Sequence, residues 1–260
     1  MNKKIITNKS DFISKCRAIL KPGLYSILPQ ADRIKSVIPY FEKVQVQVLA
    51  SPKLGANFIQ YELYFDQEKM IKIQQNDILE HFLFVIEGEI EIETHSKREI
   101  LKEGGFAYLP INTKYNIKKS KNNKGRVLIT KKIYKPLVSL GEPSLIFSNI
   151  QNIPVINYGP HLGQHLTPFT DDLSFDMGMT IEYIEPGEYL STVEIHVMEH
   201  GIYMLEGGLL YWLNGDYYEI QKNDYMYLAP YCPQFGYSIG GMKASYLLYK
   251  DVNRDYIENL

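Results

Sequence analysis

Cysteine is scarce in this chain of 260 residues, since Cys16 and Cys232 are its only two, too few for a disulfide framework. Such a low count suits a reducing compartment. Neither sign of charge is in excess, because 28 Lys and Arg residues stand against 30 Asp and Glu residues. This balance gives no electrostatic reason to expect binding to nucleic acid or to an anionic membrane.

Long apolar runs are also missing from the sequence. No uncharged stretch approaches the roughly 20 residues that a membrane-spanning helix needs. The first residues begin like the basic part of a signal peptide, but charged residues interrupt them before an apolar segment develops. We therefore expect a soluble, cytoplasmic protein.

Helix signals are few, whereas strand signals are frequent. Tyrosine supplies 21 of the 260 residues, and several segments, such as residues 44–48 and 90–93, alternate with period two. Asn214 and Gly215 separate two apolar runs and predict a tight β-hairpin. Only residues 11–20 and 253–260 could each hold a short helix. We therefore predict an all-β fold with few short helices.

The sequence also repeats itself with an offset of 119 residues. Residues 75–117 align with residues 194–236 without a gap, and His81 meets His200 in this alignment. The identities are few, but they fall at turns and at strand positions of matching polarity. Many short strands in two copies predict two similar β-barrels or sandwiches in tandem.

The repeat also predicts where the chain divides. Pro, Ser, Asn and Gly gather near residues 136–160, which is typical of a linker. We therefore assign an N-terminal barrel to residues 1–140 and a C-terminal barrel to residues 141–260.

The densest set of metal-ligand residue types lies at residues 194–200. His196, Glu199 and His200 match an inverted zinc-peptidase pattern, which needs a helix to bring both histidines onto one face. The flanks contradict a helix, because β-branched residues occupy every second position of residues 193–197. An extended segment is therefore the better prediction.

On a strand, Glu194 and His196 point to the same face because they are two residues apart. His200 can return to that face from the next strand after a short turn. Three ligand-type groups would then converge inside a barrel, with a fourth position left for a later strand.

This arrangement resembles the cupin pattern, in which a His-x-His pair, a later carboxylate and a distant histidine bind a divalent metal. Glu194 stands for the first histidine, His196 for the second and His200 for the carboxylate. Gln234 stands for the last histidine, eleven residues after Asn223, which replaces a usual glycine and can adopt left-handed backbone angles. The metal ligands that the resemblance implies are Glu194, His196, His200 and Gln234.

The combination of this Glu-x-His-x3-His set with a distant Gln resembles the two-cupin (S)-ureidoglycine aminohydrolases of purine degradation. Residues 38–42, 51–56, 175–177 and 245–255 also resemble that family, and the likeness runs from about Asn8 to Arg254. The resemblance implies an all-β fold of two tandem cupin (double-stranded β-helix, jelly-roll) barrels. One metal ion would lie in the C-terminal barrel, and the mixed donors suit Mn²⁺ or Fe²⁺ better than a structural zinc.

The family's reaction removes the α-amino group of (S)-ureidoglycine by hydrolysis and gives (S)-ureidoglycolate and ammonia. The resemblance implies that Lys250 and Tyr246 contact the substrate and that Lys250 binds its carboxylate or acts as acid or base. Glu194 would be catalytic beside Lys250, since a metal-bound carboxylate can accept a hydrogen bond from the substrate amine. Tyr211 and Gln234 complete the expected substrate pocket.

The first copy lacks this ligand set. Its matching positions are Gln75, Asp77, His81 and Tyr115, which predict a degenerate barrel kept for packing and oligomer contacts. Three other histidines, namely His95, His161 and His165, are expected to be structural or solvated.

Two other functions remain open from the sequence. The chain could be another metal-dependent cupin enzyme, an isomerase or dioxygenase acting on a small polar acid. It could also be a non-enzymatic sensor, although no helix-turn-helix pattern is visible for DNA binding. Edge strands and a spare barrel predict a homo-oligomer, whichever of these functions the protein has.

Overall fold

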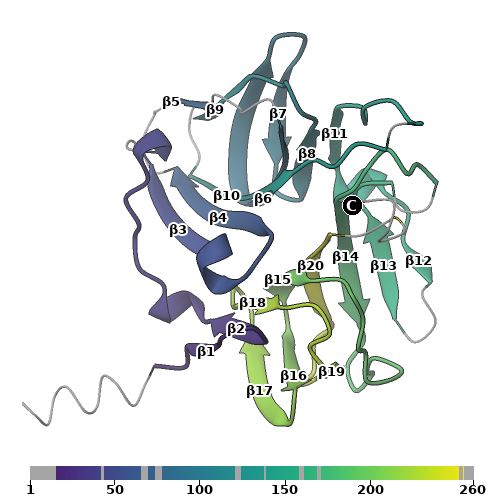
Figure 1. Cartoon of the computed structure of the whole chain (residues 1–260). Coiled ribbons are helices and arrows are strands. Elements are labelled where there is room, and N and C mark those ends of the chain that lie inside the picture. The colour runs from purple at the N-terminus through teal and green to yellow at the C-terminus, as the bar shows by residue number, and fades with distance from the viewer. Residues whose placement is uncertain are drawn as a thin grey trace, which may run out of the picture.

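The structure is a computed structural model that describes residues 16–41, 44–65, 70–73, 78–120, 124–137, 139–157, 161–168, 171–251 and 254 (Figure 1). These residues form strands, and their only helical elements are short 3-10 turns, which confirms the all-β prediction. The turns are η1 (Gln30–Asp32), η2 (Pro39–Phe41), η3 (Pro52–Leu54) and η4 (Ile150–Asn152).

The N-terminal barrel is one nine-stranded sheet, in the order β11-β8-β6-β10-β4-β3. Off this path, β7 and β9 both pair with β6, and β5 pairs with β9. The long strand β6 bends through Gly88 and so takes part in both faces of the barrel. Its strands are β3 (Gln45–Ala50), β4 (Phe58–Phe65), β5 (Met70–Ile73), β6 (Leu79–Thr94), β7 (Arg98–Lys102), β8 (Gly105–Leu109), β9 (Tyr115–Lys119), β10 (Gly125–Ile133) and β11 (Ile146–Asn149).

The C-terminal barrel combines an eight-stranded sheet, in the order β1-β2-β18-β15-β20-β14-β13-β12, with a three-stranded sheet β17-β16-β19. Its strands are β1 (Ile19–Lys21), β2 (Tyr25–Leu28), β12 (Ile156–Asn157), β13 (Leu162–His165), β14 (Gly178–Ile184), β15 (His200–Glu206), β16 (Gly208–Leu213), β17 (Asp216–Gln221), β18 (Tyr225–Leu228), β19 (Gln234–Ser238) and β20 (Ala244–Lys250).

The two barrels carry the internal repeat strand by strand. β9 and β19 begin 119 residues apart, as do β10 and β20. Gly104 and Asn223 occupy the same turn of the two copies, with φ of 73° and 68°. The left-handed conformation expected of Asn223 is therefore confirmed. Asparagine tolerates the positive φ that glycine adopts at this turn in the first copy.

Strand pairing crosses between the two halves of the chain in both directions. β2 pairs with β18 of the C-terminal barrel, although it lies near the start of the chain (Figure 1). In the other direction, β11 pairs with β8 of the N-terminal barrel. The division of the chain into domains at residues 140 and 141 stays a prediction. Each half of the chain contributes strands to the sheet of the other half.

Period-two alternation sorts the side chains into three buried clusters. One cluster fills the N-terminal barrel and includes Leu63, Ile92 and Val127. A second fills part of the C-terminal barrel, and a third, rich in aromatic rings such as Tyr108 and Phe175, packs the two barrels against each other. The C-terminal barrel differs because polar groups replace apolar ones on part of its inner face.

The two short helices suggested by the sequence are not supported where the structure describes them. Ile19 and Leu20 belong to strand β1, while residues 11–15 and most of residues 253–260 lie outside the described residues. No helix within the described ranges is long and apolar enough to cross a membrane.

Candidate active site

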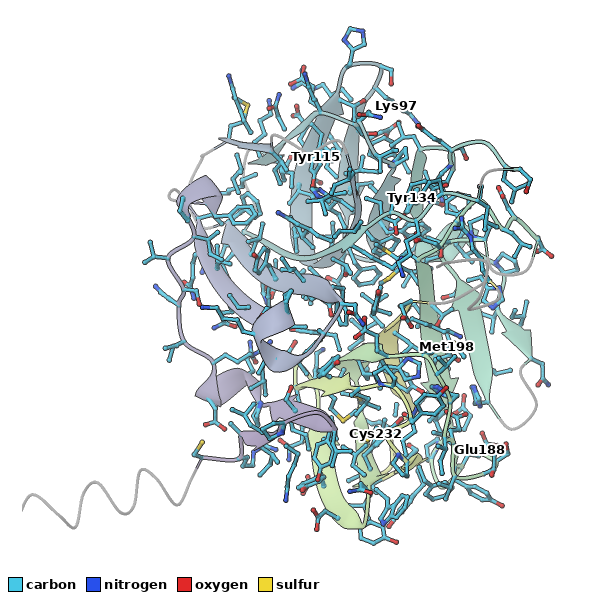
Figure 2. All side chains as sticks on the ribbon, in the orientation of Figure 1. Lys97, Tyr115, Tyr134, Glu188, Met198 and Cys232 are labelled. Atoms are coloured by element: carbon cyan, nitrogen blue, oxygen red, sulfur yellow. The ribbon has the colours of Figure 1, made fainter. Side chains whose placement is uncertain are left out.

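A small pocket of about 170 Å³ opens into the C-terminal barrel. The volume is well below the roughly 300–1,000 Å³ of sites for drug-sized ligands, so it suits a small molecule. Figure 2 shows Met198, one of its lining residues, in the lower barrel, far from Tyr115 in the upper one. The lining residues are His161, Glu182, Leu190, Glu194, His196, Met198, His200, Ile202, Tyr211, Gln234, Tyr246, Leu248 and Lys250.

Strand alternation explains why these side chains meet. On β20, Leu247 and Tyr249 join the cluster between the barrels, so Tyr246 and Lys250 point to the interior of the C-terminal barrel. On β15 and β19, the side chains of His200 and Gln234 likewise point into the barrel and line the pocket. Every residue that the sequence predicted for metal or substrate binding therefore lines this one pocket.

The segment that carries Glu194 and His196 is extended but is not a regular strand. Glu194 forms one isolated bridge with Gln234, whose two backbone hydrogen bonds measure 2.9 and 3.0 Å. The apolar residues of the segment face outward, since Val193 is 47% and Ile195 is 60% exposed. The polar residues between them consequently face the pocket, and the absence of a helix in residues 189–199 rules out the zinc-peptidase interpretation.

Two imidazole rings converge at the pocket. Nε2 of His200 lies 3.2 Å from Nε2 of His196, which in turn lies 3.1 Å from Nε2 of Gln234. A carboxylate oxygen of Glu194 is 3.7 Å from the same His196 nitrogen. The side chains of His200, Gln234 and Glu194 therefore all lie close to Nε2 of His196, and the four residues come from three separate segments.

His200 is held in the form that a metal ion requires. Its Nδ1 lies 3.2 Å from the carbonyl oxygen of Tyr249 and donates to it, which leaves the Nε2 lone pair facing the pocket. Burial lowers the pKa of His200 to about 3, helped by the charges of His196 and Lys250. The ring is therefore neutral at physiological pH.

Tyr211 fixes the side chain of Gln234. Its hydroxyl donates to Oε1 of Gln234 at 3.0 Å, and burial raises the pKa of Tyr211 so that the donor keeps its proton. A side-chain amide can also adopt the flipped orientation. Gln234 then turns its oxygen toward the histidines, and its N–H₂ donates to the Tyr211 hydroxyl.

Glu182 and His161 also line the pocket, and sequence reasoning missed both. Glu182 lies on β14, is 4% exposed, and accepts a hydrogen bond from Oγ1 of Thr180 at 2.7 Å. Nε2 of His161, which was expected to be structural or solvated, lies 3.3 Å from the other Glu182 oxygen. The repeat held the missing signal, because Glu182 aligns with Leu63, which is fully buried in the first barrel.

Lys250 is the last residue of β20 and lines the pocket together with these acids. Burial lowers the pKa of Lys250, and the carboxylates of Glu182 and Glu194 partly offset this effect. Burial likewise raises the pKa of Tyr246, so its hydroxyl remains a hydrogen-bond donor. The pocket therefore combines a cation, two carboxylates and protonated phenols.

The matching part of the N-terminal barrel is filled differently. Nδ1 of His81 lies 2.6 Å from the Tyr115 hydroxyl, and both residues are buried among aliphatic side chains. Gln75 and Asp77, the other two positions of the copy, lie outside the described residues. The degenerate character of this barrel stays a prediction.

The donor set suits a divalent cation. Among the described residues, no three His, Cys, Asp or Glu side chains are already arranged to hold a metal ion. The set found here instead joins two histidines to a carboxylate 3.7 Å away and to an amide. Because the Glu194 side chain is 38% and that of His196 26% exposed, both have room to adjust. Neutral imidazole with oxygen donors fits a borderline or hard ion.

Comparison with known proteins agrees with this picture, although no protein-family model matches the chain. The (S)-ureidoglycine aminohydrolase of Escherichia coli (strain K12) is 32% identical over 250 residues, which cover 92% of each chain. The enzyme of the same name from Arabidopsis thaliana is 26% identical over 240 residues, covering 92% of this chain and 79% of the relative.

Solved structures agree on the fold. Protein Ylba from Escherichia coli superposes with a TM-score of 0.82 at 31% identity, covering 94% of this chain and 98% of that one. A cupin 2 conserved barrel domain protein from Leptotrichia buccalis has a TM-score of 0.61 at 17% identity, covering 90% of this chain and 100% of that one. The predicted tandem cupin fold is confirmed.

Proposed function

Because the chain belongs to the (S)-ureidoglycine aminohydrolase family, we propose that it hydrolyses (S)-ureidoglycine to (S)-ureidoglycolate and ammonia in allantoin degradation. The observation that carries this proposal is the convergence of ligand-type and titratable side chains on one small pocket. The relatives do not favour a cupin isomerase, dioxygenase or sensor.

We propose that Glu194, His196, His200 and Gln234 hold one divalent ion, taken to be Mn²⁺. When bound, such an ion would supply Lewis-acid stabilisation of charge that develops at the reacting carbon's substituents. Tyr249 and Tyr211 would orient two of the ligands without binding the ion. The carbonyl oxygen of Tyr249 contacts His200, and the hydroxyl of Tyr211 contacts Gln234.

Lys250 is proposed to bind the substrate carboxylate. Its side chain lines the pocket and is desolvated there, so attraction between its ammonium and an anion is less screened than at the surface. Because burial lowers its pKa, Lys250 can also release and regain a proton more readily than an exposed lysine. A proton held at Nζ is thus available for the departing amine.

Glu194 and the two phenols complete the proposed contacts. The half-exposed Glu194 carboxylate lies at the outer side of the pocket and can accept a hydrogen bond from the substrate amine. Tyr246 and Tyr211 stay protonated and can donate to substrate oxygens. Together with Gln234 they would orient one stereoisomer.

We also infer a homo-oligomer in the cytoplasm. Support for assembly comes from β3 and β12, each at the end of its sheet, and from exposed apolar residues such as Val193 and Ile195. Cys16 and Cys232 are both free, which suits a reducing compartment.

The test is ammonia release from freshly prepared (S)-ureidoglycine by chelator-stripped protein, with and without added Mn²⁺. The substrate decays unaided, so the signal is the rate in excess of a Glu194→Ala variant. We expect Mn²⁺-dependent excess ammonia together with (S)-ureidoglycolate alone. Folded, metal-loaded protein that gives no excess would refute the proposed reaction.

A further inference from the structure

We infer that Glu182 recognises the ureido group of the substrate, as the carboxylate that accepts its N–H donors; this inference rests on the proposed function. Glu182 is 4% exposed, yet it lines the pocket together with Lys250 and Glu194. Removing a carboxylate from water is costly unless partners compensate. Lys250 and His161 offset part of this cost, and a ligand that donates hydrogen bonds to the carboxylate would offset more of it.

The partners of Glu182 leave acceptor capacity unused. Oε1 accepts the 2.7 Å hydrogen bond from Thr180, and Oε2 lies 3.3 Å from Nε2 of His161. Oε2 is buried and accepts no hydrogen bond of good geometry from any described residue. Since each carboxylate oxygen can accept about two hydrogen bonds, Glu182 can still accept at least two more.

The internal repeat shows that this acid is not required by the barrel itself. Leu63 occupies the same position of β4 in the N-terminal barrel, where it is fully buried in the apolar cluster of that barrel. Thr180 likewise replaces Tyr61. The carboxylate and its hydroxyl donor therefore occur together only in the barrel that has the described polar pocket.

The substrate has three groups to be recognised, and two already have partners. Its carboxylate suits the Lys250 ammonium, and its amine lies toward the proposed metal ligands. The ureido group, –NH–CO–NH₂, remains, and it offers two parallel N–H bonds on one side. A carboxylate pairs with two such donors in the same forked geometry that it forms with arginine. Glu182 is the buried carboxylate placed for that pairing.

Discrimination against other acids follows from this pairing. A ligand that carries a methyl group in place of the terminal NH₂ supplies one donor fewer. It would leave a buried carboxylate oxygen unpaired, which costs more than a lost hydrogen bond at an exposed site. Glu182 would thus select ureido acids over acylamino acids.

The experiment compares two probes by calorimetry on Mn²⁺-supplemented protein. N-carbamoylglycine carries the carboxylate and the ureido group, and N-acetylglycine differs only by CH₃ in place of NH₂. We expect wild type to bind N-carbamoylglycine about tenfold or more tightly than N-acetylglycine. Glu182→Gln should reduce that ratio to about threefold or less.

Controls separate recognition from damage. Glu185→Gln removes a charge just beyond the same strand, where the side chain is 48% exposed, and should keep the wild-type ratio. If Glu182→Gln does not fold, Glu182→Leu introduces the residue that the first barrel holds at this position. An unchanged ratio in the folded variant, or no preference in wild type, overturns the inference.

Turnover distinguishes this inference from the proposed reaction. If the chain releases ammonia and Glu182→Gln leaves the KM for ureidoglycine unchanged, the inference fails while the reaction stands. If the probe ratio depends on Glu182 but no ureidoglycine is consumed, the recognition stands and the proposed reaction fails. With both correct, Glu182→Gln raises KM more than it lowers kcat.

Discussion

The ring of Tyr211 occupies the space beside Gly236 that a side chain would need. The two residues are directly opposed in the β16–β19 ladder, and a Cβ on Gly236 would lie 2.8 Å from two ring carbons. The missing side chain lets the ring lie close to β19, from where its hydroxyl reaches Gln234. A glycine outside the ligand set therefore helps to place a proposed ligand.

Gly236→Ala should weaken metal binding without removing any ligand. The new methyl group displaces the ring and breaks its hydrogen bond, so Mn²⁺ affinity should fall by about 10–100-fold. Tyr211→Phe should cause a loss in the same direction because only the hydroxyl is missing. Calorimetric titration with Mn²⁺ measures both. Gly241→Ala is the matched control, since open space surrounds that glycine; equal affinity for Gly236→Ala and Gly241→Ala would contradict the account.

Removing His196 should abolish tight metal binding and leave the fold intact. His196→Ala is expected to lower Mn²⁺ affinity by about 100-fold or more. Because the side chain is 26% exposed and lies outside any strand, the free energy of unfolding of metal-free protein should change by about 1 kcal/mol or less. His95→Ala, at an exposed turn, is the control. Retained affinity in His196→Ala would place the metal elsewhere.

Lys132 holds two acids together where the barrels meet. Its Nζ lies 2.5 Å from Asp176 and 3.9 Å from Glu80, and all three residues are buried. Burial and the nearby Asp176 raise the pKa of Glu80 well above its usual range. Lys132→Ala leaves the buried Asp176 carboxylate without its ammonium partner and should lower the free energy of unfolding by about 3–5 kcal/mol.

Urea denaturation measures the effect, with Lys135→Ala as a control at an exposed neighbouring position. The control should change stability by about 0.5 kcal/mol or less. A loss for Lys132→Ala no larger than that of Lys135→Ala would show that the buried cluster tolerates an unpaired acid.

Lys131 should make stability rise with pH above neutrality. It is the counterpart of Lys250 in the first barrel, and its Nζ lies 5.1 Å from the ring centre of Phe41 and 5.4 Å from that of Tyr61. The rings favour the charged form, but burial dominates and lowers the pKa of Lys131 to about 8. Above pH 8 the unfolded chain binds more protons than the folded one, so stability increases with pH.

Lys131→Met removes the charge and keeps the length of the side chain. The variant should be more stable than wild type by roughly 1–3 kcal/mol at pH 7, and the difference should shrink by pH 9.5. Urea denaturation at both pH values tests this, beside Lys102→Met at an exposed position. A difference that stays constant with pH would mean that Lys131 keeps its proton in the folded state.

The sequence was sufficient for features that depend on local patterns. Asn214 and Gly215 form the predicted hairpin turn with φ of 47° and 103°, and the repeat predicted two barrels. The pocket residues were found because their spacing resembles a known motif. Features that depend on distant contacts were not found, since nothing near Glu182 in the sequence shows that it is buried beside Lys250. The sequence predicted a strand at residues 194–199, but among the described residues this segment pairs only through the isolated bridge between Glu194 and Gln234.

The exchange of strands between the barrels sets an order of events during synthesis. β2 leaves the ribosome among the first segments, but its partner β18 follows about 200 residues later, which takes roughly 10–40 s at typical rates of translation. Until then β2 pairs only with β1, and its other edge has no native strand to pair with. A nascent chain halted after the first barrel would therefore carry an unmatched N-terminal hairpin, and a gene fragment ending there would do the same.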